Sequence, residues 1–535
     1  MIDSIKVIFE RNLEKSREFV ESIENSKIPI IYFILTFIFI GSLRNFFDTI
    51  TDTTVSLPTK FSIGLHDFSF LNFVSNSFWY IGVVCVIGII LHLATKERIE
   101  KIFRLVLPGT IVLLTVPFTD FILSMGKGFN QSYMLPDVHG DFILRWLTLS
   151  LPYGGTGVTP GMKVETMVLL FGFFGYIYLK TRSIIRSAFF SFITYSGIFF
   201  WGTMPFGLKF FLNIFNLEYL PTPILSARFM LIFLSIFGVI IYYLYNKNYF
   251  ISLLHDLPIL RVLHYELMFV LGIFLGMNIF HKSFVLTSDN LFRLIFTPIA
   301  IVFAGIASLV VNNLHDYDID KISNIRRSTI TGTIPINHYK QLAIIAFFLA
   351  SLYTFILDFT SFFLIFLLIG SYFLYSAPPF RLKRIPFFSK FFISLNSLLL
   401  VLLGYYYATG TTDIPIEVFL FFLIGFTAFI NFIDLKDYEG DKKAGIKTLP
   451  TLLGLKKSKL IIGLFFLLGY IGMAIFVNEL LYSSFMIVFG IVEFFLINRK
   501  NYDEKPVFLI YLLSLIIFII YIAYNPLTFP GFSMG

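Results

Sequence analysis

An acidic run in the second half of the chain has the residue types and spacing of a metal site. Asn312, Asp316 and Asp320 are four residues apart, so on a helix they form one polar stripe. The run ends an apolar segment, where neighbouring carboxylates are costly unless a cation lies between them. Mg²⁺ is the natural candidate, because it prefers oxygen ligands and is typically held by one or two carboxylates plus substrate phosphate.

A second acidic run echoes the first. Residues 436–442 read Lys-Asp-Tyr-Glu-Gly-Asp-Lys, where residues 315–321 read His-Asp-Tyr-Asp-Ile-Asp-Lys, and each run ends an apolar segment. Asp434, Asp437 and Asp441 again share one helical face. A four-helix unit used twice would explain the repeat and would bring the two runs together around a pseudo-axis. Two such faces could hold a pair of metal ions with a diphosphate between them.

Two other interpretations of the acidic runs stay open. Carboxylates at the end of a membrane segment are often solvated loop residues neutralised by nearby Lys and Arg. A cation-coupled transporter also uses acidic helix ends, but its carboxylates are expected near the bilayer midplane on interrupted helices. Here basic loops flank both runs, which favours an anionic ligand.

The elements that must position these residues are membrane helices. Of the 535 residues, 57% are hydrophobic and 14% are charged, against about 25% charged residues in soluble domains. The chain is therefore predicted to be an all-α polytopic membrane protein. Its net charge of +8 lies in short loops between apolar segments, so we expect no nucleic-acid partner.

Fifteen segments approach the ~20 apolar residues that span a bilayer. Six of them precede residue 250, at about 29–47, 77–94, 105–125, 164–180, 187–206 and 228–246. Nine follow, at about 265–281, 292–314, 341–357, 360–377, 390–408, 415–434, 459–477, 480–498 and 506–524. From Leu267 onward the basic residues fall almost entirely into alternate loops, which places both acidic runs on the cytoplasmic side of a cell membrane.

These patterns predict three regions. Residues 1–28 alternate charged and apolar positions and are expected to form an interfacial helix. Residues 29–250 are expected to form an accessory transmembrane domain of about six helices, whose role the sequence does not indicate. Residues 258–535 are expected to form a bundle of about nine helices. In the first half, His66, Asp67, Asp137, His139 and Asp141 match no standard metal spacing and are interpreted as solvated loop residues.

The second half resembles the UbiA superfamily of intramembrane prenyltransferases over roughly residues 258–535. Three stretches carry the resemblance: residues 312–320 followed by Arg327, residues 375–384 (Tyr-Ser-Ala-Pro-Pro-Phe-Arg-Leu-Lys-Arg), and residues 434–441 followed by Gly445 and Thr448-Leu449-Pro450. The resemblance implies a nine-helix UbiA-like bundle. It also implies Mg²⁺-dependent transfer of a prenyl group from an isoprenoid diphosphate to a lipophilic or aromatic acceptor, as in lipid or quinone biosynthesis.

The resemblance assigns roles by position. It implies that Asp316, Asp320, Asp437 and Asp441 are catalytic, and that with Asp434 they hold the metal. The expected substrate-binding residues are Asn312, Arg327, Tyr375, Arg381, Lys383, Lys442 and Lys447. An allylic carbocation also needs aromatic walls, which Tyr317, Tyr372, Tyr375 and Tyr438 could provide. The partners implied are the diphosphate donor, the acceptor and membrane lipid.

The chain departs from the family pattern at two places. Asn313 stands where the family usually has Asp, and Ser328 follows Arg327 where Pro is usual. Losing the Asp removes one charge from the first motif, which would weaken a metal contact or mark a subgroup. A catalytically silent lipid-binding relative therefore stays open as a further alternative.

Overall fold

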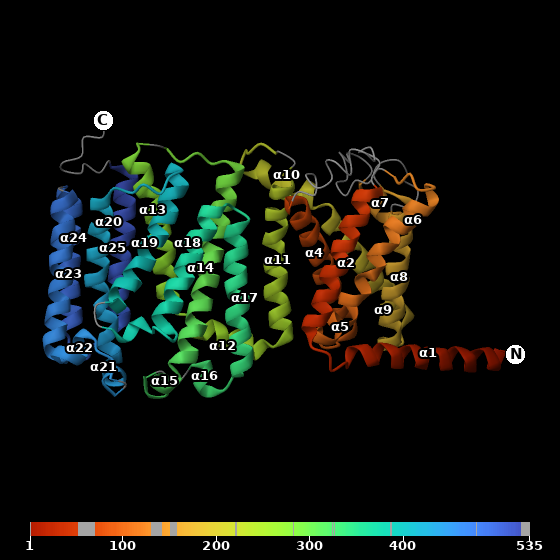
Figure 1. The fold of residues 1–535 in the computed structure, drawn as a ribbon, viewed down its shortest axis with the longest axis horizontal. Coiled ribbons are helices and arrows are strands. Elements are labelled where there is room, and N and C mark those ends of the chain that lie inside the picture. The colour runs from red at the N-terminus through yellow and green to blue at the C-terminus, as the bar shows by residue number, and fades with distance from the viewer. Residues whose placement is uncertain are drawn as a thin grey trace. The chain divides into compact units, whose positions relative to one another are not determined.

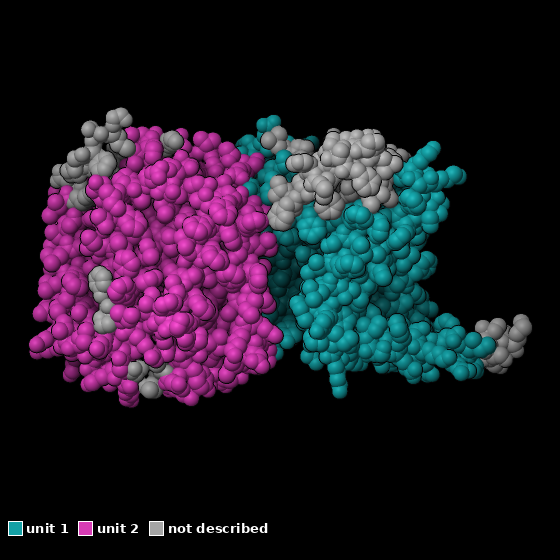
Figure 2. Space-filling model, viewed as in Figure 1, with its two compact units in different colours: residues 1–247 teal, residues 248–535 magenta. Residues whose placement is uncertain are grey.

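The structure is a computed structural model that describes residues 2–51, 70–129, 142–149, 158–219, 222–281, 283–323, 325, 327–385, 388–443, 445–477 and 479–525. Within these ranges the regular elements are α-helices and short 3₁₀ turns, without strands. His66, Asp67, Asp137, His139 and Asp141 lie outside the described residues. The chain divides into two compact units, residues 1–247 and 248–535, which Figure 2 colours separately.

The first unit contains a long polar helix and a set of apolar ones. Its elements are α1 (Ile2–Glu24), α2 (Ile30–Thr51), α4 (Phe70–Thr95), α5 (Ile99–Gly109), η1 (Thr110–Leu114), α6 (Thr115–Leu123), α7 (Phe142–Leu147), α8 (Pro160–Thr181), α9 (Ile184–Gly202), α10 (Met204–Ile214) and α11 (Pro223–Tyr245). Helix α1 lies across the ends of the long helices of this unit (Figure 1). Its Val7, Ile8, Phe9 and Phe19 are exposed, and an interfacial role for this helix stays a prediction.

A buried ion pair fixes the end of α1. Glu24 is 2% exposed, and its Oε2 lies 2.5 Å from the Nζ of Lys180 on α8. The hydroxyl of Tyr176 donates to Glu24 Oε1 at 2.8 Å, and Lys180 Nζ also lies 3.3 Å from Glu97 Oε1. A carboxylate taken out of water needs such partners, so this cluster holds α1 against α8.

The second unit is a bundle of long helices joined by short ones. Helix α12 (Lys247–Asp256) leads into it, followed by α13 (Ile259–Ile279), α14 (Ser288–His315), α15 (Tyr317–Ser323), α16 (Ser328–Thr331), α17 (Ile336–Phe355), α18 (Phe359–Ser376), η2 (Leu382–Arg384), α19 (Phe388–Thr409), α20 (Ile416–Phe429), η3 (Ile430–Ile433), α21 (Asp434–Lys443), α22 (Leu449–Leu453), α23 (Leu455–Val477), α24 (Leu480–Asn498) and α25 (Glu504–Tyr524). The short helices α15, α16, α21 and α22 lie together at one end of this bundle (Figure 1).

The lengths of the helices confirm a polytopic membrane protein. Among the described residues, fourteen helices or joined helices are long and apolar enough to cross a membrane. Six belong to residues 30–245 and eight to residues 259–524. The ninth segment predicted in the second half is α17, which is not among the fourteen because its first two turns are polar (Asn337, His338, Tyr339, Lys340 and Gln341).

The acidic runs occupy equivalent places in a repeated pattern. After α14 come the two short helices α15 and α16, and after α20 come α21 and α22. Helices α15 and α21 pack against each other, so the two runs meet, as the internal repeat predicts. The apolar segment before each run is a long helix, α14 or α20, and the run itself lies where that helix is interrupted.

Two glycines bring α13 and α19 into close contact. A Cβ on Gly272 would lie 2.0 Å from the carbonyl oxygen of Val401, and a Cβ on Gly404 would lie 2.0 Å from that of Phe269. Only glycine allows backbones to approach this closely, as is common between membrane helices.

Candidate functional site

A cavity of about 240 Å³ opens at the end of the second unit where the short helices gather. Its lining comes from helices far apart in the sequence, including α13, α14, α18, α19, α21 and α25. One end is charged, with the carboxylates Asp316, Asp320, Asp434, Asp437 and Asp441 and the cations Arg261, Arg327, Lys383, Lys390 and Lys436. The remainder is apolar or aromatic, with Val262, Ile301, Ala304, Gly305, Leu309, Leu368, Tyr372, Tyr375, Ile393 and Phe508 among its lining residues.

The first acidic run is not one continuous helix. Helix α14 ends at His315, Asp316 is its C-cap residue, and α15 begins at Tyr317. The i to i+4 hydrogen bonds nevertheless continue through the break, from Asp316 N–H to Asn312 C=O at 2.9 Å and from Asp320 N–H to Asp316 C=O at 2.8 Å. The polar stripe therefore survives, and all three of its side chains line the cavity.

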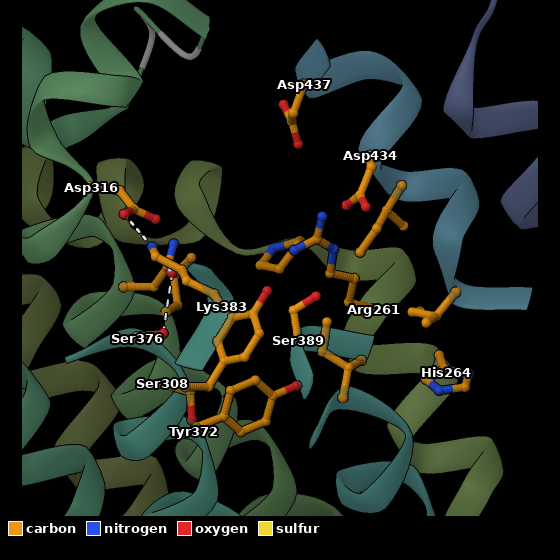
Figure 3. A pocket seen from close by; sticks show the side chains of 18 of the residues that line it. Arg261, His264, Ser308, Asp316, Tyr372, Ser376, Lys383, Ser389, Asp434 and Asp437 are labelled. Atoms are coloured by element: carbon orange, nitrogen blue, oxygen red, sulfur yellow. Dashed lines mark hydrogen bonds and ion pairs between the residues drawn. The ribbon is translucent and has the colours of Figure 1, made fainter. Parts of the chain in front are cut away.

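The second acidic run forms a short helix after a change of helix type. Helix α20 tightens into the 3₁₀ turn η3, and α21 then starts at Asp434. Asp434, Asp437 and Asp441 all line the cavity. In Figure 3, Asp434 and Asp437 lie on the opposite side of the cavity from Asp316. The structure thus places both predicted carboxylate sets around one space.

Lysine and arginine side chains form ion pairs with some of these carboxylates. Asp316 contacts Lys383 and lies 3.0 Å from an Nη of Arg381, and Asp320 contacts Arg327. Asp434 Oδ1 lies 2.5 Å from the Nζ of Lys390. Burial lowers the pKa of Lys383, and the Asp316 carboxylate opposes this shift by stabilising the ammonium form. These pairs keep charged groups at a partly buried site, where unpaired charges would be costly.

Other carboxylate atoms have no partner among the described residues. The half-buried carboxylates of Asp437 and Asp441 have no hydrogen bond or ion pair there, and the buried Oδ2 of Asp434 is also unpaired. Buried polar atoms normally have partners, so the Oδ2 of Asp434 is a candidate ligand atom. In the described part of the chain, no three His, Cys, Asp or Glu side chains converge closely enough to hold a metal ion alone. The donor set fits Mg²⁺, which commonly completes its shell with water and phosphate oxygens.

Of the remaining residues predicted to bind substrate, some line the cavity and others lie outside it. Tyr375 lines the cavity beside Tyr372, whose hydroxyl contacts that of Tyr265, and Asn312 accepts hydrogen bonds from Ser376 Oγ at 3.2 Å and Lys383 Nζ at 3.4 Å. Arg381 does not line the cavity but contacts the carboxylate of Asp316, which does. Lys442 and Lys447 are exposed and outside the lining, and the half-buried Tyr317 and Tyr438 also lie outside it.

Three cations at the site were not predicted from the sequence. Arg261 projects from the first turn of α13, Lys390 from the first turn of α19 and Lys436 from α21 (Figure 3 labels Arg261). In the sequence all three lie at or between the ends of the predicted segments, where basic residues are expected to orient helices. A basic residue in the first turn of a membrane helix can orient the helix or bind a ligand, so the sequence carries no signal that identifies Lys390 and Arg261 as site residues.

Comparison with known proteins agrees with the motifs. Residues 283–516 match the UbiA prenyltransferase family, so the resemblance is confirmed for the C-terminal half of the chain. A digeranylgeranylglyceryl phosphate synthase of Pyrococcus horikoshii is 29% identical over 182 residues, covering 32% of this chain and 61% of the relative. A 2-acyl-4-prenylphloroglucinol 6-prenyltransferase of Humulus lupulus is 32% identical over 163 residues, covering 26% of this chain and 38% of the relative. The chain therefore spans less than two thirds of either curated relative.

Solved structures were also similar over the second half. A UbiA homologue from Archaeoglobus fulgidus bound to GPP and Mg²⁺ is 20% identical with a TM-score of 0.40, covering 51% of this chain and 100% of that chain. A second structure of that homologue, bound to DMAPP and Mg²⁺, gives the same identity and TM-score and covers 97% of that chain.

Proposed function

We propose that the second unit transfers a prenyl group, in a Mg²⁺-dependent reaction, from an isoprenoid diphosphate to a lipophilic or aromatic acceptor in the membrane. The observation that carries this proposal is the shape of the charge distribution around one cavity. Two opposed sets of carboxylates and five cations line one end, and apolar and aromatic side chains line the rest. A molecule with an anionic head and an apolar chain matches both parts.

The charged end would bind the diphosphate. Lys383, Lys390, Arg261 and Arg327 are placed to donate to phosphate oxygens, and charge-assisted hydrogen bonds of this kind are among the strongest in proteins. Asp316 and Asp320 on one side, and Asp434, Asp437 and Asp441 on the other, would hold the metal. When bound, Mg²⁺ would neutralise charge on the diphosphate oxygens and so make diphosphate a better leaving group.

The reaction balances without a further reactant. The carbon–oxygen bond between the prenyl C1 and the diphosphate breaks, and its electron pair leaves with the diphosphate. A new bond forms between C1 and a hydroxyl oxygen or ring carbon of the acceptor, which loses one proton. The cations of the site stabilise the departing charge, while Tyr372 and Tyr375 present rings to the cationic prenyl carbon. The apolar lining excludes water that would otherwise capture that carbon.

Relatives suggest two acceptor classes. The Pyrococcus relative is named for a glyceryl phosphate product, and the Humulus relative for an aromatic acceptor. We propose a lipid hydroxyl first, because the match to the Pyrococcus relative extends over 182 residues and the match to the Humulus relative over 163. Aromatic rings are the second class to be tested. We further propose that the loops carrying the site face the cytoplasm at the cell membrane, since basic residues gather in these loops.

The domain boundaries are also a proposal. We propose that residues 29–250 form an accessory transmembrane domain after an interfacial segment at 1–28, and that residues 258–535 form the prenyltransferase domain. A cation-coupled transporter is the second candidate. The observation in its favour is the interruption of α20 by η3 just before Asp434. Against it, five cations line the same cavity, which suits an anion better than a transported cation.

The experiment is a transfer assay on membranes that contain the full chain. Labelled geranyl, farnesyl and geranylgeranyl diphosphate would be supplied in turn with Mg²⁺ and a panel of lipid and aromatic acceptors. We expect labelled, chloroform-soluble product with at least one pair, and release of diphosphate in equal amount. Uptake of a cation into sealed vesicles, with no labelled product from any pair, would instead support the transporter.

A further inference from the structure

Asn313 lies next to Asn312 in the sequence but faces a different side of α14. Asn312 lines the cavity, whereas Asn313 is outside the lining and 0% exposed. Successive residues on a helix point about 100° apart, so a residue adjacent to the polar stripe turns toward the protein. Asn313 Nδ2 donates to the hydroxyl oxygen of Tyr339 on α17 at 2.9 Å. The position where the family usually has Asp is therefore a packing position here, not a metal ligand.

The hydroxyl of Tyr339 is in turn hydrogen-bonded to Asp256, the last residue of α12. It donates to Asp256 Oδ2 at 2.9 Å. The other carboxylate oxygen, Asp256 Oδ1, accepts from the backbone N–H of Ser328 at 3.1 Å, and Ser328 Oγ donates to the carbonyl of Ser252 at 3.3 Å. Each oxygen of Asp256 thus has one donor, and the bonds run in a single direction from Asn313 to Asp256.

This network reaches the site at two points. Ser328 follows Arg327, which contacts the carboxylate of Asp320 at the cavity. Asn313 belongs to the last turn of α14, from which Asn312 and Asp316 face the same cavity. Asp256 itself precedes residues 283–516, the part of the chain that matches the family. A group from outside the shared region therefore anchors both sides of the first acidic run.

We propose that Asp256 is a positioning residue for the diphosphate and metal site, and that Asn313 replaces the usual Asp because Asp256 supplies the carboxylate of this network. The inference rests on the proposed function. Tyr339 has one hydroxyl proton to donate, so a second carboxylate beside it would lack a donor. Two buried carboxylates on one phenol would also repel each other. The neutral amide of Asn313 avoids this repulsion, and its Nδ2 donates to the phenol oxygen, while its buried Oδ1 has no partner among the described residues.

The test reverses the direction of the hydrogen bonds. In Asp256→Asn/Asn313→Asp, Tyr339 would donate to the carboxylate at 313. The amide at 256 would donate to Tyr339 and accept from the Ser328 N–H. The matched set contains both single substitutions, the double substitution, Tyr339→Phe, and Asp318→Asn as a control. Asp318 is an exposed carboxylate in the same run, with a 95% exposed side chain, and it lies outside the cavity lining.

The full chain would be assayed with geranylgeranyl diphosphate across a Mg²⁺ series. We expect each single substitution and Tyr339→Phe to raise the half-saturating Mg²⁺ concentration about tenfold, the scale typical for groups that orient metal ligands. The double substitution should return it to within about threefold of wild type. Asp318→Asn should leave it unchanged. Thermal unfolding midpoints, measured with and without donor and Mg²⁺, separate loss of stability from loss of positioning.

Several outcomes overturn the inference. A double substitution as impaired as both singles combined would mean that the two positions do not exchange roles. Singles that lower the unliganded midpoint, yet keep the wild-type half-saturation in the folded fraction, would show a merely structural network. If the wild-type chain transfers no prenyl group, the proposed function fails. The positioning role of Asp256 is then tested by comparing, among the same variants, how far donor and Mg²⁺ raise the unfolding midpoint. A wild-type midpoint that donor and Mg²⁺ do not raise overturns both proposals.

Discussion

The Nζ of Lys390 lies 2.5 Å from Oδ1 of Asp434, across the boundary between α19 and α21. The arrangement mirrors the contact of Lys383 with Asp316 at the other acidic run. Each carboxylate set therefore has one lysine beside it. Lys383 comes from η2, between α18 and α19, and Lys390 comes from the first turn of α19. In the proposed reaction these lysines would bind the diphosphate, and the carboxylates would hold the metal.

Replacing Lys390 by Met should separate donor binding from metal binding. The variant loses a charge-assisted bond to phosphate, so the KM for the donor should rise about ten- to a hundredfold. Removing the cation also leaves Asp434 freer for a metal, so the half-saturating Mg²⁺ concentration should not rise. Initial rates over a donor-by-Mg²⁺ grid measure both. Lys442→Met is the matched control, because Lys442 is exposed and outside the lining; equal effects of the two substitutions would exclude the role given to Lys390.

Removal of divalent metal should stop the reaction. The carboxylates at the cavity would have no cation to bridge them to the diphosphate, so chelation with EDTA should reduce transfer to background. Added Mg²⁺ should restore it, while added Na⁺ at the same ionic strength should not. Product formation after dialysis and readdition is the measurement. Membranes that keep their full rate in EDTA would show that the acidic runs serve another purpose.

Gly305 should leave the space that a long prenyl chain needs. It lines the apolar part of the cavity on α14, and a Cβ there would meet no atom within 4 Å. A Phe at this position would therefore fill space that a long chain needs. Gly305→Phe should reduce the rate with geranylgeranyl diphosphate about tenfold more than the rate with geranyl diphosphate. Gly370→Phe is the control, since Gly370 on α18 has equally open space and lies outside the lining. A uniform loss with both donors would contradict the assignment.

The first unit should depend on its buried ion pair. Lys180 and Glu24 have side chains that are 7% and 1% exposed, so Lys180→Met leaves Glu24 buried and without its cation. Breaking such a pair on one side costs about 3–5 kcal/mol. Arg17→Met removes the partner of Glu21 in a pair that is 52% and 39% exposed, where solvent screening makes the expected loss of stability much smaller. Denaturant unfolding in detergent should rank the two; similar losses would mean that the buried cluster does not hold α1.

The sequence was sufficient for much of the second unit because its signals are local. The spacing of Asp316 and Asp320, the repeat at Asp437 and Asp441, and the apolar segments are all readable from neighbouring residues. The direction of a side chain behind the stripe is not local. From the sequence, Asn313 indicates a weakened metal contact, a subgroup or a catalytically silent relative, whereas its hydrogen bond to Tyr339, and that of Tyr339 to Asp256, form only through folding.

The same reasoning explains the cations. Arg381, Lys442 and Lys447 are predicted to bind substrate because they lie near the motifs in the sequence. The cavity is instead lined by Arg261 and Lys390, which come from the first turns of α13 and α19. A basic residue at the cytoplasmic end of a membrane helix has the same sequence signature whether it orients the helix or binds a ligand. Only the packing of α13 against α19 distinguishes the two.

Transfer of the prenyl group by membranes containing Asp316→Asn or Asp441→Asn, compared with wild type, tests the central claim most directly. These residues come from the two opposed acidic runs, and Asp318→Asn supplies a matched neutralisation of an exposed carboxylate. With saturating donor and Mg²⁺, we expect each of the first two substitutions to lower the rate at least about a hundredfold, and Asp318→Asn to keep the wild-type rate. Wild-type turnover in both Asp316→Asn and Asp441→Asn would contradict a reaction that takes place between the two runs.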